Sequence, residues 1–247
     1  GIWITASGRK ITLEKKGDVV IFAVLGALLA FHWTAFFMSI QITTVAVGVL
    51  TFATFPAFTV LLEPLFFREK LSVKNLGLAG LCFLGVFLIV PQAELWGGGQ
   101  MEPDFVAGVL WGLASGLSFS YLSLINKKHA GAYGGIRLAF YQCAFATVFA
   151  LPSLWLYPEV TLGPQALGWL ILLGVVFTGL AHSLFIQAMR DVKAQTASLI
   201  AAMEPVYGIV LAWLVLREVP APSSFAGGVL ILLAVGALHF QKDSPNT

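Results

Sequence analysis

The sequence predicts an all-α membrane protein with about eight transmembrane helices. Of its 247 residues, 58% are hydrophobic and only 11% are charged, whereas a soluble globular domain carries about 25% charged residues. The apolar residues form eight separate runs, and a helix needs roughly 20 such residues to cross a hydrocarbon core. The runs are continuous and lack the alternation of a membrane β-strand, so the pattern favours helices over a barrel.

Three spans are expected in the first part of the chain. The first, Val19–Gln41, follows a basic stretch at the start of the sequence. The second, Val45–Phe67, ends at a charged Arg-Glu-Lys segment. The third, Val73–Val90, is rich in glycine, which is common in membrane helices.

Five further spans are expected in the second part. They are Phe105–Ile125, Ile136–Leu156, Ala166–Ala188, Ala194–Leu216 and Phe225–Phe240. The first of them carries two overlapping GxxxG patterns, formed by Gly108, Gly112 and Gly116. Such a pattern gives a helix a flat face and predicts close packing against another helix.

The loops between the spans predict the orientation. When the spans are threaded alternately, all of the 14 Lys and Arg residues except Arg217 fall on one side. The opposite side holds the acidic residues Glu94, Glu102, Asp104 and Glu159. The positive-inside rule places the Lys/Arg-rich side in the cytoplasm, so we expect both termini of this chain to be cytoplasmic. The membrane is expected to be a bacterial inner (plasma) membrane.

An internal repeat relates the two parts of the chain. Pro56 precedes Arg68-Glu69 by the same spacing by which Pro205 precedes Arg217-Glu218, with a constant offset of 149 residues (205 minus 56, and 217 minus 68). In the threading above the two Arg-Glu pairs lie on opposite sides of the membrane, so the copies are inverted. Inverted repeats are a recurring plan of secondary transporters, whose solute binds near the bilayer midplane between the repeats.

These residues resemble the EamA-type branch of the drug/metabolite transporter superfamily. The resemblance is carried by Phe55-Pro56, Leu61, Arg68-Glu69-Lys70-Leu71-Ser72, Glu204-Pro205-Val206, Leu211-Ala212-Trp213 and Leu216-Arg217-Glu218. It implies a fold of ten helices in two inverted repeats of five, and the import or export of small metabolites. The chain is expected to hold a first repeat in residues 1–95 that lacks two N-terminal helices, and a second repeat in residues 104–241.

The function predicted is secondary transport by alternating access, without catalysis of a reaction. We expect the solute to be a small metabolite such as an amino acid, an amine or a drug-like compound, and the direction to be export. Solute and membrane lipid are the expected partners, while the small net charge of +2 argues against nucleic acid. No cofactor or metal is expected. The sequence leaves proton coupling and homodimer formation open.

Glu204 is the first candidate for solute binding, because an ionisable residue inside a membrane span is costly and usually faces a cavity or a partner. Pro205 removes a backbone donor beside it and frees a carbonyl group, and Tyr207 follows on the same helix. Pro56 occupies the matching depth in the inverted copy. The alternative is that these prolines mark packed kinks and that the Glu204 carboxyl group is protonated.

Aromatic, histidine and hydroxyl side chains complete the predicted site. His32 and His182 lie at almost equivalent repeat positions, and each is either a cavity residue or a packing residue. The remaining candidates are Trp33, Trp111, Ser115 and Tyr121. The resemblance implies that the helix with Trp111, Ser115 and Tyr121 opens the second repeat and lines the pathway.

Two other functions are open to an all-helical membrane protein, namely an intramembrane enzyme and a channel. An intramembrane serine protease would use Ser115 with His182, but the sequence has no GxSG motif around Ser115, no HExxH motif and no aspartate inside a span. A channel would need a carbonyl-filter sequence or a ring of charged residues, and neither pattern is present. Both rivals are therefore disfavoured.

Overall fold

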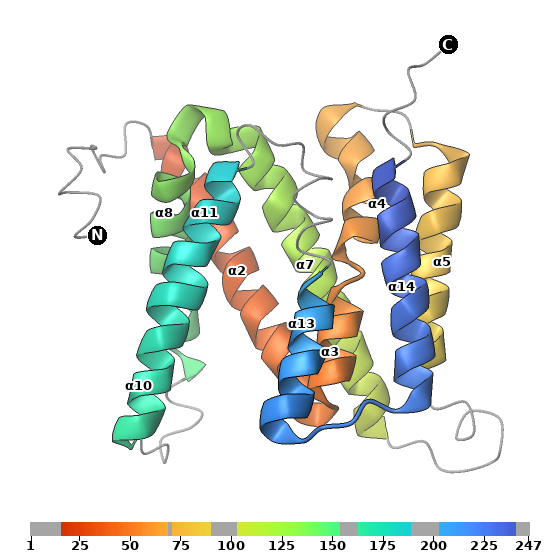
Figure 1. The fold of residues 1–247 in the computed structure, drawn as a ribbon. Coiled ribbons are helices and arrows are strands. Elements are labelled where there is room, and N and C mark those ends of the chain that lie inside the picture. Colours follow the sequence, from red (N-terminus) through yellow and green to blue (C-terminus); the bar gives the residue numbers. More distant parts are fainter. Residues whose placement is uncertain (1–15, 69–70, 90–102, 154–162, 189–202, 241–247) are drawn as a thin grey trace. The chain divides into compact units, whose positions relative to one another are not determined.

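The computed structural model describes residues 16–68, 71–89, 103–153, 163–188 and 203–240, and in these residues all regular structure is helical (Figure 1). Four helical segments are long and apolar enough to cross a membrane, namely Gly17–Ile42, Val45–Phe67, Asp104–Tyr133 and Pro164–Ala188. Four shorter apolar segments are Val73–Ile89, Gly135–Ala150, Glu204–Leu216 and Pro222–Ala237. Each segment overlaps one expected span, so the prediction of an all-helical membrane fold is confirmed.

The described helices follow one another along the chain. They are α2 (Lys16–Ile42), α3 (Val45–Phe52), α4 (Phe55–Phe67), α5 (Val73–Ile89), α7 (Pro103–Tyr133), α8 (Gly135–Ala150), α10 (Pro164–Leu172), the π-helix η1 (Leu173–Leu180), α11 (Ala181–Ala188), α13 (Glu204–Leu211), the π-helix η2 (Ala212–Leu216) and α14 (Pro222–Phe240). The first part of the expected span Ala194–Leu216 lies outside the described residues.

One span is interrupted. The expected helix Val45–Phe67 is built as α3 and α4, with Ala53 and Thr54 between them. The interruption lies directly before Pro56, which has no backbone N–H to continue the hydrogen-bond ladder of α3. Thr54 closes the break locally, because its Oγ donates to the carbonyl oxygen of Thr51 at 2.7 Å. The proline kink expected from the sequence is thus a two-residue turn between α3 and α4, in which Ala53 and Thr54 keep right-handed backbone angles.

Another helix is longer than expected. The sequence placed the end of the fourth span at Ile125, but α7 continues to Tyr133. Lysines at a helix end can extend their charged groups toward water while the backbone stays helical. The end of α7 is fixed by the hydroxyl group of Tyr133, which donates to Asp18 Oδ1 at 2.7 Å. Gly134, with φ of 75°, then turns the chain into α8.

The chain divides into two compact units, and the division falls inside α2 and inside α7. Unit 1 comprises residues 1–30 and 125–194, and unit 2 comprises residues 31–124 and 195–247. Each unit contains parts of both predicted repeats. The units describe compact packing and the repeats describe sequence similarity, so the repeat boundaries 1–95 and 104–241 stay a prediction.

Unit 2 has a core in which α5 and α14 run side by side (Figure 1). Their contact depends on glycine, because a Cβ atom on Gly85 would lie 2.8 Å from the carbonyl oxygen of Gly227, and a Cβ atom on Gly227 would lie even closer to that of Gly85. The surrounding core is aliphatic and includes Leu50, Val86 and Ile231. Small residues that let two backbones approach are typical of membrane helix pairs.

Unit 1 is organised around the pair of α8 and α11. The backbone N–H of Gly135 donates to Gln187 Oε1 at 3.1 Å, and this bond joins the start of α8 to the end of α11. Phe22 of α2 lies against two tyrosine rings of the unit, at 5.2 Å from Tyr133 and 4.6 Å from Tyr141.

Candidate functional site

A buried polar pair lies in unit 2 between α2 and α7. His32 Nδ1 is 2.8 Å from Ser115 Oγ and 3.3 Å from the Ser115 carbonyl oxygen. Ser115 Oγ in turn donates to the carbonyl oxygen of His32 at 3.2 Å. Ser115 has an exposed fraction of 0% and His32 one of 8%. The two side chains were separate candidates in the sequence, and the structure brings them together.

Aromatic rings surround the imidazole of His32. Its ring centroid is 4.9 Å from that of Phe119, 5.2 Å from that of Phe52 and 6.2 Å from that of Phe36. Phe55 extends the group, at 5.2 Å from Phe52 and 5.1 Å from Phe119. We call His32, Phe36, Phe52, Phe55 and Phe119 the ring cluster. Aromatic pairs at these separations contribute about 0.5–1.5 kcal/mol each beyond the burial of their surface.

The ring cluster lies at the break between α3 and α4. Phe52 is the last residue of α3 and Phe55 is the first residue of α4. The carbonyl oxygen of Phe55 accepts from Ser120 Oγ at 2.7 Å and from Thr59 Oγ at 2.8 Å. Pro56 therefore lies beside a concentration of hydroxyl and carbonyl groups inside an apolar span. Irregular backbone at membrane depth occurs where it is buried in protein or lines a cavity.

One face of α7 packs against this break through its glycines. A Cβ atom on Gly112 would fall 1.9 Å from Thr51 Oγ, and one on Gly116 would fall 3.2 Å from the carbonyl oxygen of Phe52. Gly108 meets the side chain of Thr43 in the same way, at 2.4 Å. Helix packing, which the sequence favoured for these glycines, is what the structure shows.

Glu204 lies at the start of a helix. It is the first residue of α13, where a carboxylate interacts favourably with the positive end of the helix dipole. Its side chain is exposed, that of Pro205 is buried, and that of Tyr207 is 64% exposed. Residues 194–202 lie outside the described part of the chain, so the depth expected for Glu204 in its span stays a prediction.

The two prolines occupy equivalent positions in their helices. Pro56 is the second residue of α4 and Pro205 is the second residue of α13. Arg68 follows α4 and Arg217 follows η2, with φ values of 55° and 60°. Among the described residues these are the non-glycine residues with positive φ. The two motifs, which are 149 residues apart, thus have the same local backbone conformation at the proline and at the arginine.

Three further aromatic candidates lie on α2 and α7. Trp33 is half-buried on α2. Trp111 is half-buried on α7, with its ring 6.3 Å from that of Phe31. Tyr121, further along α7, has its ring 6.1 Å from that of Phe66 in α4. All three belong to unit 2, and whether they touch a solute stays a prediction.

His182 belongs to unit 1 and has other partners. Its Nε2 lies 3.0 Å from Gln142 Oε1, and the Gln142 amide also exchanges hydrogen bonds with the amide of Asn126. Gln142 and Asn126 are buried. They were not among the residues expected in the site, although amides within apolar runs are a usable signal. The hydrogen-bond partner of Ser115 is His32. The protease alternative required Ser115 to act with His182.

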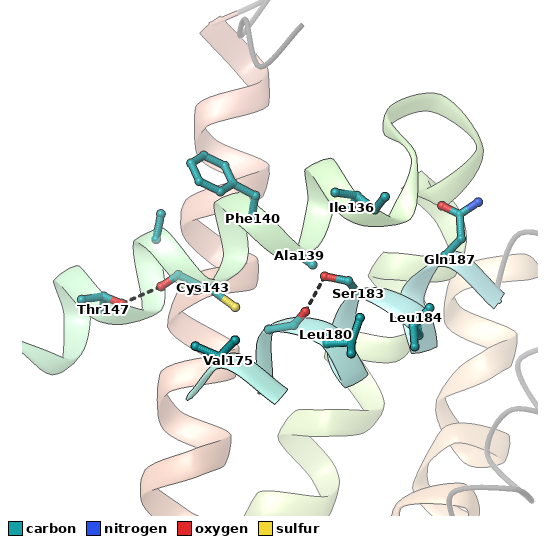
Figure 2. Close-up of a pocket in the computed structure, with 12 residues that line it drawn as sticks. Ile136, Ala139, Phe140, Cys143, Thr147, Val175, Leu180, Ser183, Leu184 and Gln187 are labelled. Atoms are coloured by element: carbon teal, nitrogen blue, oxygen red, sulfur yellow. Dashed lines mark hydrogen bonds between the residues drawn. The ribbon is translucent and has the colours of Figure 1, made fainter. Parts of the chain in front are cut away.

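Unit 1 also holds a pocket of about 610 Å³ between α8 and the helices η1 and α11 (Figure 2). The hydroxyl groups in its wall are bonded to backbone carbonyl groups four residues earlier: Thr147 Oγ donates to the Cys143 carbonyl oxygen at 2.8 Å, and Ser183 Oγ donates to that of Gly179. The pocket therefore presents mainly apolar surface. Among the described residues, no group of His, Cys, Asp and Glu side chains could hold a metal ion.

Comparison with known proteins decides the class of the molecule. The model of the EamA-like transporter family matches residues 2–90 and 106–239. The chain belongs to this family. The resemblance seen in the paired proline and Arg-Glu motifs is therefore confirmed.

Curated relatives are transporters. The uncharacterized transporter YxxF of Bacillus subtilis is 24% identical over 85% of this chain and 66% of its own length. An S-adenosylmethionine uptake transporter of Rickettsia bellii is 28% identical over 85% of this chain and 68% of its own length. The pseudopaline exporter CntI of Pseudomonas aeruginosa is 28% identical over 98% of this chain and 82% of its own length. The chain thus spans about two thirds of the length of the first two.

The fold also has a solved counterpart. A structure described only as the crystal structure of a protein matches with a TM-score of 0.67 and 18% identity, over 98% of this chain and 84% of that chain. At this identity the likeness shows the fold alone. Together with the apolar helices, membership of the EamA-like family makes this chain an integral membrane transporter of small solutes and not an enzyme.

Proposed function

We propose that this EamA-like transporter carries its solute by alternating access, with a binding region beside the α3–α4 break of unit 2. The observation that carries the proposal is the His32–Ser115 pair, a buried hydrogen-bonded group enclosed by aromatic rings within apolar spans. Polar groups inside a membrane are costly and usually mark a solute or ion pathway. A broken helix at the same place supports this reading, because discontinuous helices form the binding sites of many secondary transporters.

The groups in this part of the chain favour a small solute with an amino or other cationic group. Aromatic rings attract cations through their π-electron faces, and Glu204 adds a carboxylate on α13. The relative named for S-adenosylmethionine fits the same description, because that compound carries an amino group and a positively charged sulfur. We therefore propose an amino acid, an amine or a drug-like cation as the solute.

Direction and orientation are part of the proposal. Export remains our prediction, and the relatives named for uptake and for export support opposite directions. We place both ends of this chain in the cytoplasm, as the Lys/Arg-rich loops predict, in a bacterial inner membrane. Proton coupling through the Glu204 carboxyl group would link solute movement to a proton gradient.

Transport by purified chain in proteoliposomes tests the proposal. The assay measures uptake of radiolabelled S-adenosylmethionine, lysine, phenylalanine and tyramine, with and without an imposed proton gradient. We expect saturable uptake of at least one solute and its loss in Glu204→Gln. The matched control is Glu63→Gln in α4, which removes another carboxylate from the same unit and should leave uptake unchanged. Correctly inserted protein that moves none of these solutes, or moves them without saturation, would overturn the proposal.

A further inference from the structure

The carboxylate of Glu218 holds the beginning of α3. Its Oε2 accepts from the backbone N–H of Val45 at 3.2 Å, and its Oε1 accepts from the backbone N–H of Ala46 at 3.1 Å. Each oxygen thus satisfies one of the N–H groups that the first turn of a helix leaves without an internal partner. Hydrogen bonds from backbone N–H groups to a carboxylate are roughly twice as strong as those between neutral groups.

A tight turn precedes Glu218. The π-helix η2 ends at Leu216, Arg217 adopts a left-handed conformation with φ of 60°, and the N–H of Glu218 donates to the carbonyl oxygen of Ala212 at 3.3 Å. A non-glycine residue with positive φ costs about 1 kcal/mol or more and persists only where its surroundings require it. The turn brings Glu218, which lies 172 positions after Ala46 in the sequence, to the start of α3.

The half-helix α3 connects Glu218 to the ring cluster. It has eight residues, it is separated from α4 by the break at Ala53 and Thr54, and its last residue is Phe52. Phe52 stacks on Phe55 and lies 5.2 Å from the ring of His32. Glu218 is thus bonded to one end of α3, and Phe52 of the ring cluster is the residue at the other end.

Helix α13 also contacts α3, on its side. A Cβ atom on Gly208 would lie 3.4 Å from the Val49 side chain, so α13 and α3 are in van der Waals contact there. Glu218 and Gly208 both belong to the segment that contains α13, η2 and the following turn. This segment therefore touches α3 at its beginning and along its length.

We propose that Glu218 is a positioning residue for transport: it fixes the start of α3 and through this half-helix sets the place of Phe52 in the ring cluster. The inference rests on the proposed function, because it assumes that solute passes the ring cluster. Glu218 stabilises one access state of the carrier and is released in the other. Its effect is on the balance of the two states and not on contact with solute.

Thr44 supplies a matched control. Its Oγ accepts from the backbone N–H of Val47 at 3.2 Å, so it caps the same helix from within the helix's own sequence. Replacing an N-cap Thr by Ala costs about 0.5–2 kcal/mol. Thr44→Ala therefore weakens the first turn of α3 without releasing the helix from the segment that carries Glu218.

The experiment compares Glu218→Gln with Thr44→Ala in proteoliposomes. The half-saturating concentrations of S-adenosylmethionine, lysine, phenylalanine and tyramine are measured for uptake and for efflux. We expect Glu218→Gln to change the ratio of the two concentrations about tenfold, because one access state loses both charge-assisted bonds to the carboxylate. Thr44→Ala should leave the ratio unchanged. Glu218→Asp keeps the carboxylate and should change the ratio less than Glu218→Gln does. Equal ratios in wild type and Glu218→Gln, or equal changes in both variants, would overturn the inference.

A second measurement needs no transported solute. Amide hydrogen exchange of α3 in lipid nanodiscs should rise as far as Phe52 in Glu218→Gln, and only in the first turn in Thr44→Ala. A wild-type chain that transports none of the four solutes counts against the proposed function alone. In that case amide hydrogen exchange still tests the role of Glu218. If the Phe52 amide is equally protected in wild type and in Glu218→Gln, the positioning role is rejected.

Discussion

Replacement of Gly112 by alanine should destabilise the protein through a clash between α7 and α3. The added Cβ atom would fall 1.9 Å from Thr51 Oγ, 2.7 Å from Thr51 Cβ and 2.9 Å from Ser39 Oγ. These distances lie far inside van der Waals contact, and Thr51 cannot turn away because its Cβ atom is itself too close. The helices must separate, so we expect a loss of about 1–3 kcal/mol, the usual range for overpacking.

Gly131→Ala is the control in the same helix. Apart from the adjacent backbone of its own helix, no atom lies within 4 Å of the position that its Cβ would occupy, so the substitution brings only the better helix propensity of alanine. That gain is about 0.5–1 kcal/mol. Both variants replace a glycine of α7 by alanine, but Gly112→Ala should lower the stability and Gly131→Ala should raise it.

The assay is thermal unfolding in detergent, followed by size-exclusion chromatography of the remaining native protein. Gly112→Ala should unfold several degrees below wild type, and Gly131→Ala at or slightly above it. Combining Gly112→Ala with Thr51→Ala should restore stability only in part, because the Cβ of residue 51 remains 2.7 Å away. An unfolding temperature for Gly112→Ala equal to that of wild type would refute the packing described for α7.

Two further predictions concern buried hydrogen bonds. Ser115→Ala removes the 2.8 Å contact with His32 and should cost about 1–3 kcal/mol of stability. Ser153→Ala, at the exposed end after α8, is the control and should cost little. Equal unfolding temperatures for the two variants would contradict this prediction. Gln142→Leu and Asn126→Leu should each destabilise unit 1, and the double variant should lose less than the sum because the two amides bond to each other. Strict additivity in a double-mutant cycle would count against that network.

Several features of the site were accessible from the sequence because they depend on local chemistry. Pro56 predicted an irregular backbone at its position, since proline lacks an N–H wherever it is placed. The glycines Gly112 and Gly116 predicted close helix contact, since their spacing puts them on one helix face. His32 and Ser115 stood out as polar residues within apolar runs. Each of these inferences needed only a few neighbouring residues.

Other features escaped because they depend on residues distant in the chain. Asn126 and Gln142 are 16 positions apart and meet only once α7 and α8 are packed together. The continuation of α7 to Tyr133 was missed because Lys127 and Lys128 resemble the end of a span, although a membrane helix can extend beyond the apolar core. The π-helices η1 and η2 were not expected, because their apolar residues do not differ in pattern from those of an α-helix.

The sequence by itself determined that this chain is an all-helical EamA-like membrane transporter, because composition, the length of apolar runs and repeated motifs follow from the order of residues alone. The tertiary structure decided which candidates act together. It joined His32 to Ser115, placed both beside the α3–α4 break, and brought Glu218 to the start of α3. The physical reason is that hydrogen bonds and ring contacts reach only a few ångströms, so their partners are fixed by packing and not by spacing along the chain.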